Sequence, residues 1–319
     1  MTPEPQTFDI QSIAVNLPAE ALLSPLHATL SRQARNGVIQ SPPGTGKTTV
    51  LPPFLANLIR ECPDVYPQQG PVLVTAPRRV AVRAAARRLA HLDGSRLGEK
   101  VGFTVRGEHH QGTHVQFLTP GVLIRRLLAD PELAGVSAVI IDEVHERQLD
   151  TDLIIGMLTE LSQLRDDFSL IAMSATLDAA HFATLLSADV FVAEAPLHPL
   201  NIRYLPGTAP RLGAKGVNWD YLDHLAQVTD EAVSQRQDSA LVFLPGVREI
   251  DYFSTKLSAL GQGEVYPLHG RLTPAEQDRA LARSDRPRIV VSTPVAESSL
   301  TVPGVRIVVD SGLSRSPRR

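Results

Sequence analysis

Short runs of apolar residues without alternation recur along the whole chain, and each predicts a strand buried on both faces of a parallel sheet. In the first half they lie at residues 37–40, 71–75, 115–118, 137–141 and 169–174, and in the second half at residues 240–244, 265–268, 288–293 and 305–310. Segments with helical spacing follow many of these runs, at residues 50–60, 121–130, 151–164, 221–235 and 248–260. This alternation of strand and helix predicts an α/β fold in which helices cover mostly parallel sheets.

The alternation is interrupted between the two halves, where the apolar pattern loosens beyond Phe191 and prolines recur at positions 196, 199, 206 and 210. A stretch of this kind predicts an interdomain connection. We therefore expect two domains, at residues 36–199 and 200–319, after an N-terminal extension of residues 1–35. In that extension, residues 1–10 are predicted to be disordered and residues 17–33 to form a helix that Pro25 interrupts.

A loop rich in glycine and proline follows the first predicted strand and precedes a predicted helix. Its sequence at residues 41–49, Ser-Pro-Pro-Gly-Thr-Gly-Lys-Thr-Thr, matches the phosphate-binding pattern G-x-x-x-x-G-K-[ST], except that serine replaces the first glycine. Gly44 and Gly46 allow main-chain N–H groups to turn inward around a phosphate, and the following helix offers its N-terminus to the anion. Lys47 is placed to reach the β- and γ-phosphates, and the Thr48 hydroxyl to bind Mg²⁺. The alternative is a helix-capping loop, which the Gly-Lys-Thr sequence between strand and helix disfavours.

The predicted strand at residues 137–141 ends in two adjacent carboxylates, Asp142 and Glu143, which His145 follows. Ligands of open α/β sheets bind beyond the carboxyl ends of the strands, so these side chains are expected at the edge of a site. The stretch by itself is equally consistent with a solvated, salt-bridged turn. Together with the phosphate loop it predicts a nucleoside triphosphatase, with Asp142 as the Mg²⁺ carboxylate and Glu143 as the residue that orients or deprotonates the attacking water.

Composition and charge narrow the class of protein. The chain has 319 residues, 43% of them hydrophobic and 20% charged, which is typical of a globular protein long enough for two domains. Its one cysteine excludes a disulfide framework and no segment has the length of a membrane span, so we expect a cytoplasmic protein without a membrane partner. A formal net charge of −3 provides no overall basic surface, so any nucleic acid must bind in a local groove.

Arginines are concentrated after the predicted strand at residues 71–75. Arg78 and Arg79 follow that strand directly, and Arg83, Arg87 and Arg88 come next among alanines. A solvated helix face is the commoner explanation of such a run. Its place at the carboxyl end of a strand, beside the phosphate loop, favours contact with an anion instead.

The order of these stretches resembles that of the DEAH-box helicases of superfamily 2, and most of all the bacterial HrpB-type members. Asp142-Glu143-Val144-His145 matches the DEAH signature, and the loop at residues 41–49 matches the phosphate loop. Further matches in the family's order are Thr-Ala-Pro-Arg-Arg-Val-Ala (75–81), Thr-Pro-Gly (119–121), Ser-Ala-Thr (174–176), Leu-Pro-Gly (244–246), Leu-His-Gly (268–270) and Ser-Thr-Pro-Val-Ala-Glu-Ser-Ser-Leu-Thr-Val (292–302).

The resemblance implies a motor of two tandem RecA-like domains that couples ATP hydrolysis, with Mg²⁺, to translocation along single-stranded RNA and strand displacement. The residues implied for catalysis are Lys47, Asp142, Glu143 and His145, and the Mg²⁺ ligands are Thr48 and Asp142. Those implied for ATP binding are Pro43, Gly44, Thr45, Gly46, Lys47, Thr48, Thr49, Arg88, Ser299 and Thr301. RNA contacts are implied for Arg78, Arg79, Thr119, Gly246 and Thr293, and coupling of the ATP state to unwinding for Ser174 and Thr176.

Two alternatives stay open at this level. A DNA-directed translocase would use the same motor, because contacts to the 2′-hydroxyl cannot be identified in a sequence. The family's arginine-rich motif is expected downstream of Asp310, and the sequence reaches Arg319 without it. We therefore expect a truncated core with an incomplete second domain, and an ATP- and RNA-binding module without efficient turnover is the second alternative.

Overall fold

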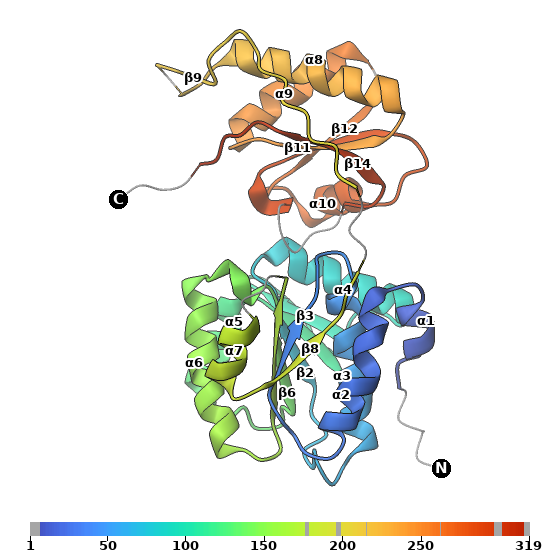
Figure 1. Ribbon diagram of the computed structural model, residues 1–319, viewed down its shortest axis with the longest axis vertical. Coiled ribbons are helices and arrows are strands. Elements are labelled where there is room, and N and C mark those ends of the chain that lie inside the picture. The colour runs from blue at the N-terminus through green and yellow to red at the C-terminus, as the bar shows by residue number, and fades with distance from the viewer. Residues whose placement is uncertain are drawn as a thin grey trace. The chain divides into compact units, whose positions relative to one another are not determined.

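The computed structural model describes residues 7–175, 179–195, 199–214, 216–261, 263–296 and 302–315. The chain divides into two compact units, Met1–Leu197 and His198–Arg319. Each unit builds a hydrophobic core of its own around one main sheet (Figure 1).

The first unit is organised around an eight-stranded sheet of order β4-β3-β5-β2-β6-β7-β1-β8. Neighbouring strands pair in parallel except β3 and β4, which form an antiparallel hairpin. The strands are β1 (Gly37–Gln40), β2 (Val72–Thr75), β3 (Val101–Val105), β4 (Glu108–His110), β5 (Val115–Leu118), β6 (Ala138–Ile141), β7 (Ser169–Ser174) and β8 (Asp189–Val192). Strands β2, β5, β6 and β7 are buried along their whole length, as unbroken apolar runs predict.

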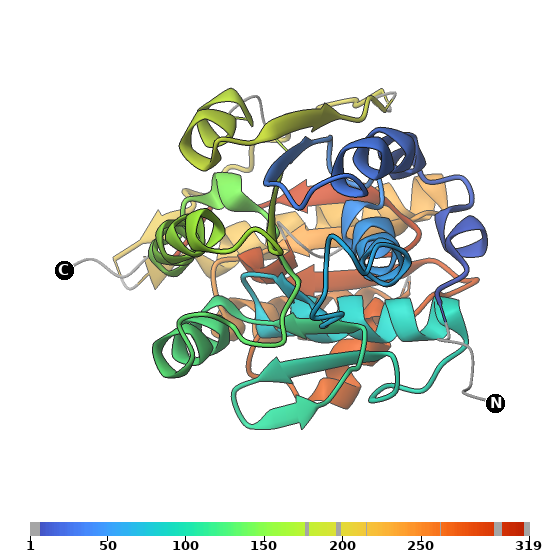
Figure 2. The ribbon, with the colours of Figure 1, turned by 90° about the horizontal axis from the view of Figure 1, so that it is seen from below.

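Helices cover both faces of this sheet (Figure 2). On one face lie α1 (Ile10–Ala14), the 3-10 helix η1 (Pro18–Leu22), α2 (Leu23–Leu30), α3 (Lys47–Glu61) and α4 (Arg79–Asp93). On the other lie α5 (Pro120–Ala129), α6 (Leu149–Leu164) and α7 (Ala179–Leu186), whose apolar side chains form one core with those of the sheet. The short 3-10 helix η2 (Val144–Glu146) follows β6. Since α3 to α7 each follow a strand, the loops that begin them lie along the carboxyl edge of the sheet.

The second unit contains a four-stranded parallel sheet of order β12-β13-β11-β14. Its strands are β11 (Ser239–Phe243), β12 (Glu264–Leu268), β13 (Arg288–Ser292) and β14 (Val305–Asp310), and β9 (Leu212–Gly213) pairs with β10 (Gly216–Val217) in a separate ladder. Helices α8 (Trp219–Arg236) and α9 (Val247–Leu260) pack on one face of the sheet and α10 (Pro274–Leu281) on the other, while the 3-10 helix η3 (Pro294–Ala296) follows β13. Nowhere in the described ranges is a helix both long and apolar enough to cross a membrane.

Several details of the fold differ from the expectations. Residues 7–10 are ordered rather than disordered, because Phe8 is only 3% exposed, Asp9 caps α1 and Ile10 begins that helix. The segment expected to form one helix over residues 17–33 forms two elements, η1 and α2. Pro25 does not interrupt α2. Pro25 lies in the first turn of α2, where a helix needs no main-chain N–H bond. The hairpin β3–β4 and the edge strand β8 were not predicted. The edge strands β4 and β8 are partly exposed and lack the unbroken apolar runs of the central ones, and Gly102 and Thr104 interrupt the apolar run of β3.

Candidate functional site

The phosphate loop connects β1 to α3, and its main chain has the shape that the two glycines predict. Gly44 and Gly46 have φ angles of +78° and +89°, in the left-handed region that favours glycine. A Cβ atom on Gly46 would also lie 2.8 Å from Leu17 Cδ1. Gly46 is the N-cap of α3 and no side chain caps the first turn, so helix N–H groups are available to an anion. Pro43 and Gly44 are exposed, and Thr49 is half-buried in the first turn.

Lys47 is buried at the start of α3, and its ammonium group is bonded to the loop itself. Nζ donates to the carbonyl oxygen of Ser41 at 2.5 Å and lies 3.5 Å from that of Pro42. Burial lowers the pKa of Lys47, against the opposing effect of the nearby carboxylates Asp142 and Glu143. A bound phosphate would therefore supply an anion in direct contact with this desolvated ammonium group, which now bonds main-chain oxygens.

Ser41, which replaces the first glycine of the pattern, has a structural partner inside the loop. Its Oγ lies 2.6 Å from Thr45 Oγ1, and the Thr45 hydroxyl also donates to the Pro42 carbonyl at 3.0 Å. Both side chains are buried. The serine therefore contributes a hydroxyl contact that closes the loop, which the sequence pattern alone did not indicate.

The acidic stretch reaches the phosphate loop across the sheet. Thr48 Oγ1 donates to Asp142 Oδ2 at 2.8 Å, although β7 lies between β1 and β6 in the strand order. Asp142 is 4% exposed, and burial together with the charge of Glu143 raises its pKa to about 7. Burial also raises the pKa of Glu143. Glu143 has a left-handed φ of +56°, and its N–H donates to Asp142 Oδ1 at 3.0 Å.

The donor set at this point fits Mg²⁺. A threonine hydroxyl and an aspartate carboxylate are hard oxygen ligands, and Mg²⁺ in phosphate sites is held by one or two such groups with the substrate phosphates. Across the described ranges, no group of three or more histidine, cysteine, aspartate or glutamate side chains is placed to hold a metal ion. In a phosphate site of this kind, Thr48 and Asp142 would hold the ion together with the phosphates of the nucleotide.

His145 connects Glu143 to the end of β7. Its Nε2 lies 3.2 Å from Glu143 Oε2, and its Nδ1 accepts the N–H of Ala175 at 3.2 Å. Because Nδ1 accepts, the neutral ring carries its proton on Nε2 and donates it toward Glu143. The bond to Nδ1 is made by the main chain of Ala175. Ser174 is buried at the end of β7, where its carbonyl accepts the Ser41 N–H at 3.1 Å, and Thr176 lies outside the described residues.

The residues predicted to contact RNA in the first unit lie along the same edge. Arg78 and Arg79 follow β2 and Thr119 follows β5, and these two strands are neighbours. The Arg79 guanidinium donates to the main-chain oxygen of Arg106 at 2.7 Å. The sequence missed this contribution of the β3–β4 turn, for which the left-handed Gly107 was the available signal. Arg88 is exposed further along α4, roughly 13 Å along the helix axis from Arg79.

In the second unit, the predicted residues lie at the carboxyl ends of two adjacent strands. Gly246, at the N-cap of α9, follows β11, and Thr293 follows β13. Gly246 is buried and Thr293 is half-buried. Ser299 and Thr301, predicted to bind ATP, lie outside the described residues.

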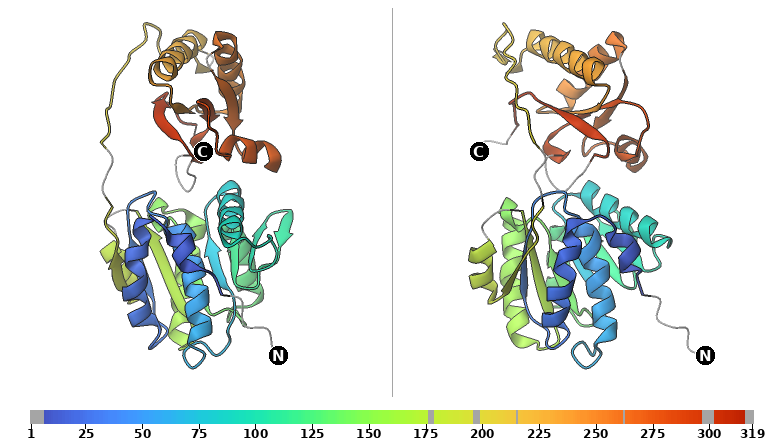
Figure 3. Two further views of the ribbon diagram at one scale, coloured as in Figure 1. Left: turned by 90° about the vertical axis from the view of Figure 1, so that its right-hand side faces the viewer. Right: turned by 45° about the vertical axis from the view of Figure 1, so that its right-hand side comes forward.

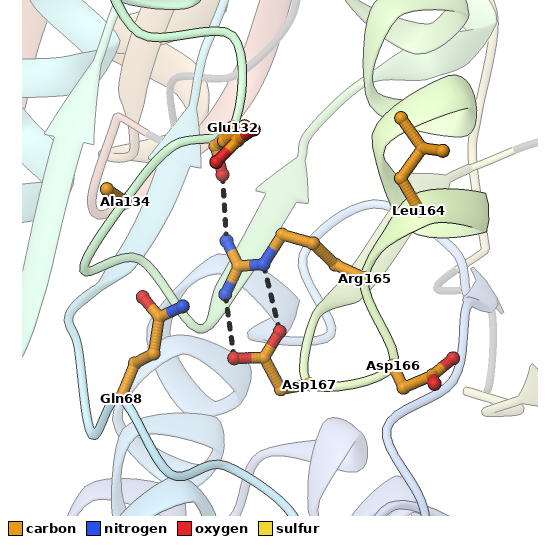
Figure 4. Close-up of a pocket in the computed structure, with 7 residues that line it drawn as sticks. All are labelled: Gln68, Glu132, Ala134, Leu164, Arg165, Asp166 and Asp167. Atoms are coloured by element: carbon orange, nitrogen blue, oxygen red, sulfur yellow. Dashed lines mark hydrogen bonds and ion pairs between the residues drawn. The ribbon is translucent and has the colours of Figure 1, made fainter.

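A surface cavity of about 340 Å³ in the first unit is separate from this constellation (Figure 4). Its lining residues precede β2, β6 and β7, so it lies at the amino edge of the sheet. Arg165 at its centre is already bonded to Asp167 and to the main-chain oxygens of Glu132 and Leu133. The cavity therefore contributes nothing to the candidate site.

Comparison with known proteins identifies the family. The DEAD/DEAH box helicase family matches residues 24–184, and the helicase conserved C-terminal domain matches residues 220–319. The ATP-dependent RNA helicase HrpB of Escherichia coli (strain K12) is 37% identical over 312 residues, which are 95% of this chain and 36% of that relative. The ATP-dependent RNA helicase HrpA of the same strain is 34% identical over 286 residues, 88% of this chain and 21% of the relative.

A solved structure agrees with these matches. The crystal structure of the Escherichia coli DEAH/RHA helicase HrpB superposes with a TM-score of 0.78 at 37% identity, over 92% of this chain and 37% of that one. The chain spans about a third of the length of the HrpB relative. The predicted resemblance and the predicted fold of two tandem RecA-like domains are confirmed. On the match over residues 24–184, this chain belongs to the DEAD/DEAH box helicase family.

Proposed function

We propose that the protein is an ATP-dependent RNA helicase of the DEAH type, which couples ATP hydrolysis to translocation on single-stranded RNA and strand displacement. Family membership supports the helicase class, and the relatives HrpB and HrpA are named as ATP-dependent RNA helicases. We assign ATP binding and the DEAH motif to a domain of residues 36–199, and further ATP and RNA contacts to residues 200–319.

The hydrogen bond between Thr48 and Asp142 carries this proposal. These residues are 94 positions apart in the sequence, and their side chains meet at 2.8 Å. One belongs to a loop shaped for phosphate and the other to an acidic pair of one buried and one half-buried carboxylate, which is the combination that phosphoryl transfer to water requires. A helix-capping loop and a solvated turn would have no reason to meet.

In this proposal the phosphate loop binds the triphosphate through its main chain. Residues 44–48 offer the phosphates their main-chain N–H groups, and the N-terminus of α3 adds its partial positive charge. Pro43 and Thr49 are assigned to the two ends of this loop. Lys47 exchanges the Ser41 carbonyl for the β- and γ-phosphates. Arg88, Ser299 and Thr301 are assigned to the remainder of the nucleotide on the family resemblance.

Hydrolysis requires a base that is held in place. When bound to Thr48 and Asp142, Mg²⁺ would neutralise charge on the phosphates. Glu143 accepts the proton of the attacking water, and its raised pKa makes it a better acceptor than an exposed glutamate. His145 orients Glu143 through the 3.2 Å contact of its Nε2.

RNA is assigned to the carboxyl edges of both sheets, through Arg78, Arg79 and Thr119 in the first unit and Gly246 and Thr293 in the second. Contacts of these types hold phosphates and sugars, so they select little base sequence. Ser174 and Thr176 are assigned to coupling. The chain from Glu143 through His145 to Ala175 supports that assignment, because it connects the hydrolytic base to this segment.

Phosphate release from the chain tests the proposal, measured without polymer and with single-stranded RNA or DNA of the same sequence. We expect Mg²⁺-dependent release that RNA stimulates more than DNA does, together with displacement of a paired RNA strand. Equal stimulation by DNA would favour a DNA-directed translocase. Tight binding of ATP and RNA with no release would favour a nucleotide-gated binding module.

A further inference from the structure

The segment of residues 7–22, here called the N-terminal strap, runs beside α3 and ends against the phosphate loop. It contains α1 and η1, both of which contact α3 (Figure 3). No sequence pattern predicted such a role, because residues 1–10 were expected to be disordered. Its two ends are attached in different ways.

The far end of the strap is held by Asn57 in the middle of α3. The Asn57 amide accepts the Phe8 N–H at 2.9 Å and donates to the Phe8 carbonyl at 2.8 Å, so both main-chain groups of one residue are paired. Asn57 is 8% exposed and Phe8 3% exposed. Lys100 donates to the Thr7 carbonyl at 3.0 Å and lies 5.2 Å from the centre of the Phe8 ring.

The near end of the strap touches the phosphate loop at two adjacent residues. The N–H of the fully buried Ala19 donates to the Thr45 carbonyl at 3.0 Å. The Leu17 side chain packs so closely on Gly46 that its Cδ1 lies 2.8 Å from where a Cβ would be. Because the Thr45 hydroxyl is bonded to Ser41 and Pro42 inside the loop, Thr45 is held from both sides.

Attachment of the loop to the strap reduces the main free-energy cost of binding a phosphate there, which is the ordering of a glycine-rich loop. Gly44 and Gly46 have wide conformational freedom, and ordering them when the ligand arrives weakens affinity. A loop that is already held in its binding shape avoids that loss. We propose that the N-terminal strap is a positioning element of the nucleotide site, with Leu17 and Asn57 as positioning residues, and this inference rests on the nucleotide binding proposed above.

The first test replaces Leu17 and measures the Kd for the non-hydrolysable ATP analogue AMPPNP with Mg²⁺, alongside thermal unfolding. Leu17→Ala should raise Kd roughly 3- to 30-fold, and the conservative Leu17→Met should restore it to within about twofold. The matched control is Leu161→Ala, because Leu161 is buried on α6, on the opposite face of the sheet. That variant should lower Tm while leaving Kd unchanged. A parallel rise in Kd for both alanine variants would overturn the inference.

The second test removes the two hydrogen bonds between Asn57 and Phe8 at the far end of the strap. Asn57→Ala should raise Kd about 2- to 10-fold, since it frees the strap without touching the loop. The control is Asn36→Ala, which removes an amide that bonds Ser162, Leu186 and Leu170 beside the amino end of β1. If wild-type protein binds AMPPNP and neither Leu17→Ala nor Asn57→Ala changes Kd, the strap is only structural. If wild-type protein itself fails to bind AMPPNP, the proposed nucleotide site is wrong, which is a different failure.

Discussion

Two aspartates in the first unit each lie near a basic side chain, at opposite edges of the same sheet, and their electrostatics are opposite. At the amino edge, Arg165 pairs with both oxygens of Asp167 at 2.9 and 3.0 Å, and this hydrogen bonding lowers the pKa of Asp167. At the carboxyl edge, Lys47 donates hydrogen bonds to main-chain oxygens, and burial and Glu143 raise the pKa of Asp142 to about 7.

This difference in electrostatics distinguishes a structural ion pair from a ligand-binding site. Arg165 and Asp167 satisfy each other, so a ligand would gain little by binding there. Asp142, Glu143 and Lys47 are desolvated, and the hydrogen bonds of Lys47 and Asp142 go to a main-chain oxygen and to the Thr48 hydroxyl. This arrangement costs folding free energy, and a cation and a phosphate would relieve it. A surface cavity lies beside the satisfied pair and not beside the desolvated carboxylates, so the presence of a cavity does not distinguish the two edges.

The largest expected effect is on turnover at the carboxyl edge. Glu143→Gln keeps the size of the side chain and leaves Asp142 and Thr48 in place, but it removes the base. ATP hydrolysis should fall roughly 10²- to 10⁴-fold while the Kd for Mg-ATP stays near that of wild type. Phosphate release and nucleotide titration measure the two quantities separately. Loss of binding in parallel with turnover would show that Glu143 is structural.

Lys47→Ala should act on binding. Hydrogen bonds to charged groups contribute about 1.5–3 kcal/mol each, and the lost contacts to two phosphates correspond to an increase of roughly 10²- to 10⁴-fold in the Kd for ATP. Fluorescence titration with a labelled ATP analogue measures this change. Wild-type affinity would mean that the loop does not bind phosphate, and that the carboxyl edge is no more a ligand site than the amino edge.

Replacing Arg78 and Arg79 together by alanine should weaken RNA binding about tenfold or more, to a similar extent for unrelated sequences. Each lost phosphate contact should also reduce the slope of log K against log salt by roughly 0.7 for a single strand. The control replaces Arg32 and Arg96, two exposed arginines toward the amino edge, and should leave affinity nearly unchanged. Altered sequence preference at an unchanged slope would indicate base contacts instead.

The smallest effect on function is expected from a change in the ion pair of Arg165 and Asp167, whose charged groups already bond each other. Arg165→Met should reduce the free energy of unfolding by about 1–3 kcal/mol, because it leaves Asp167 and two carbonyls without their donor, while the Kd for ATP is unchanged. Since the pKa of Asp167 is lowered in the folded protein, the contribution of the pair is fully present above the ordinary value of 3.8 and is lost as pH falls below it. Denaturant unfolding of wild type and variant at neutral and acidic pH measures both effects, and a raised Kd for ATP would contradict the comparison.

Much of the fold followed from the sequence, because its central strands are apolar runs and a buried parallel strand needs little else. The edge elements were harder. Strand β8 exposes Val190 and Val192, and its run is too interrupted to stand out. The N-terminal strap was expected to be disordered near Phe8, because its short helices have no clear apolar periodicity of their own. Contacts with α3, including the bonds of Asn57 to Phe8, hold it in place.

The sequence by itself determined the phosphate loop, the acidic stretch and their order, because the chemistry of each depends on neighbouring residues: glycines that allow a positive φ, a lysine and threonine at the start of a helix, and two carboxylates after a buried strand. Tertiary structure decided which other residues these segments contact. That Thr48 bonds Asp142, that His145 joins Glu143 to Ala175, and that Leu17 packs on Gly46 depend on the order of strands in the sheet and on which helix covers which face. Those contacts join residues far apart in the chain, and local periodicity carries no information about them.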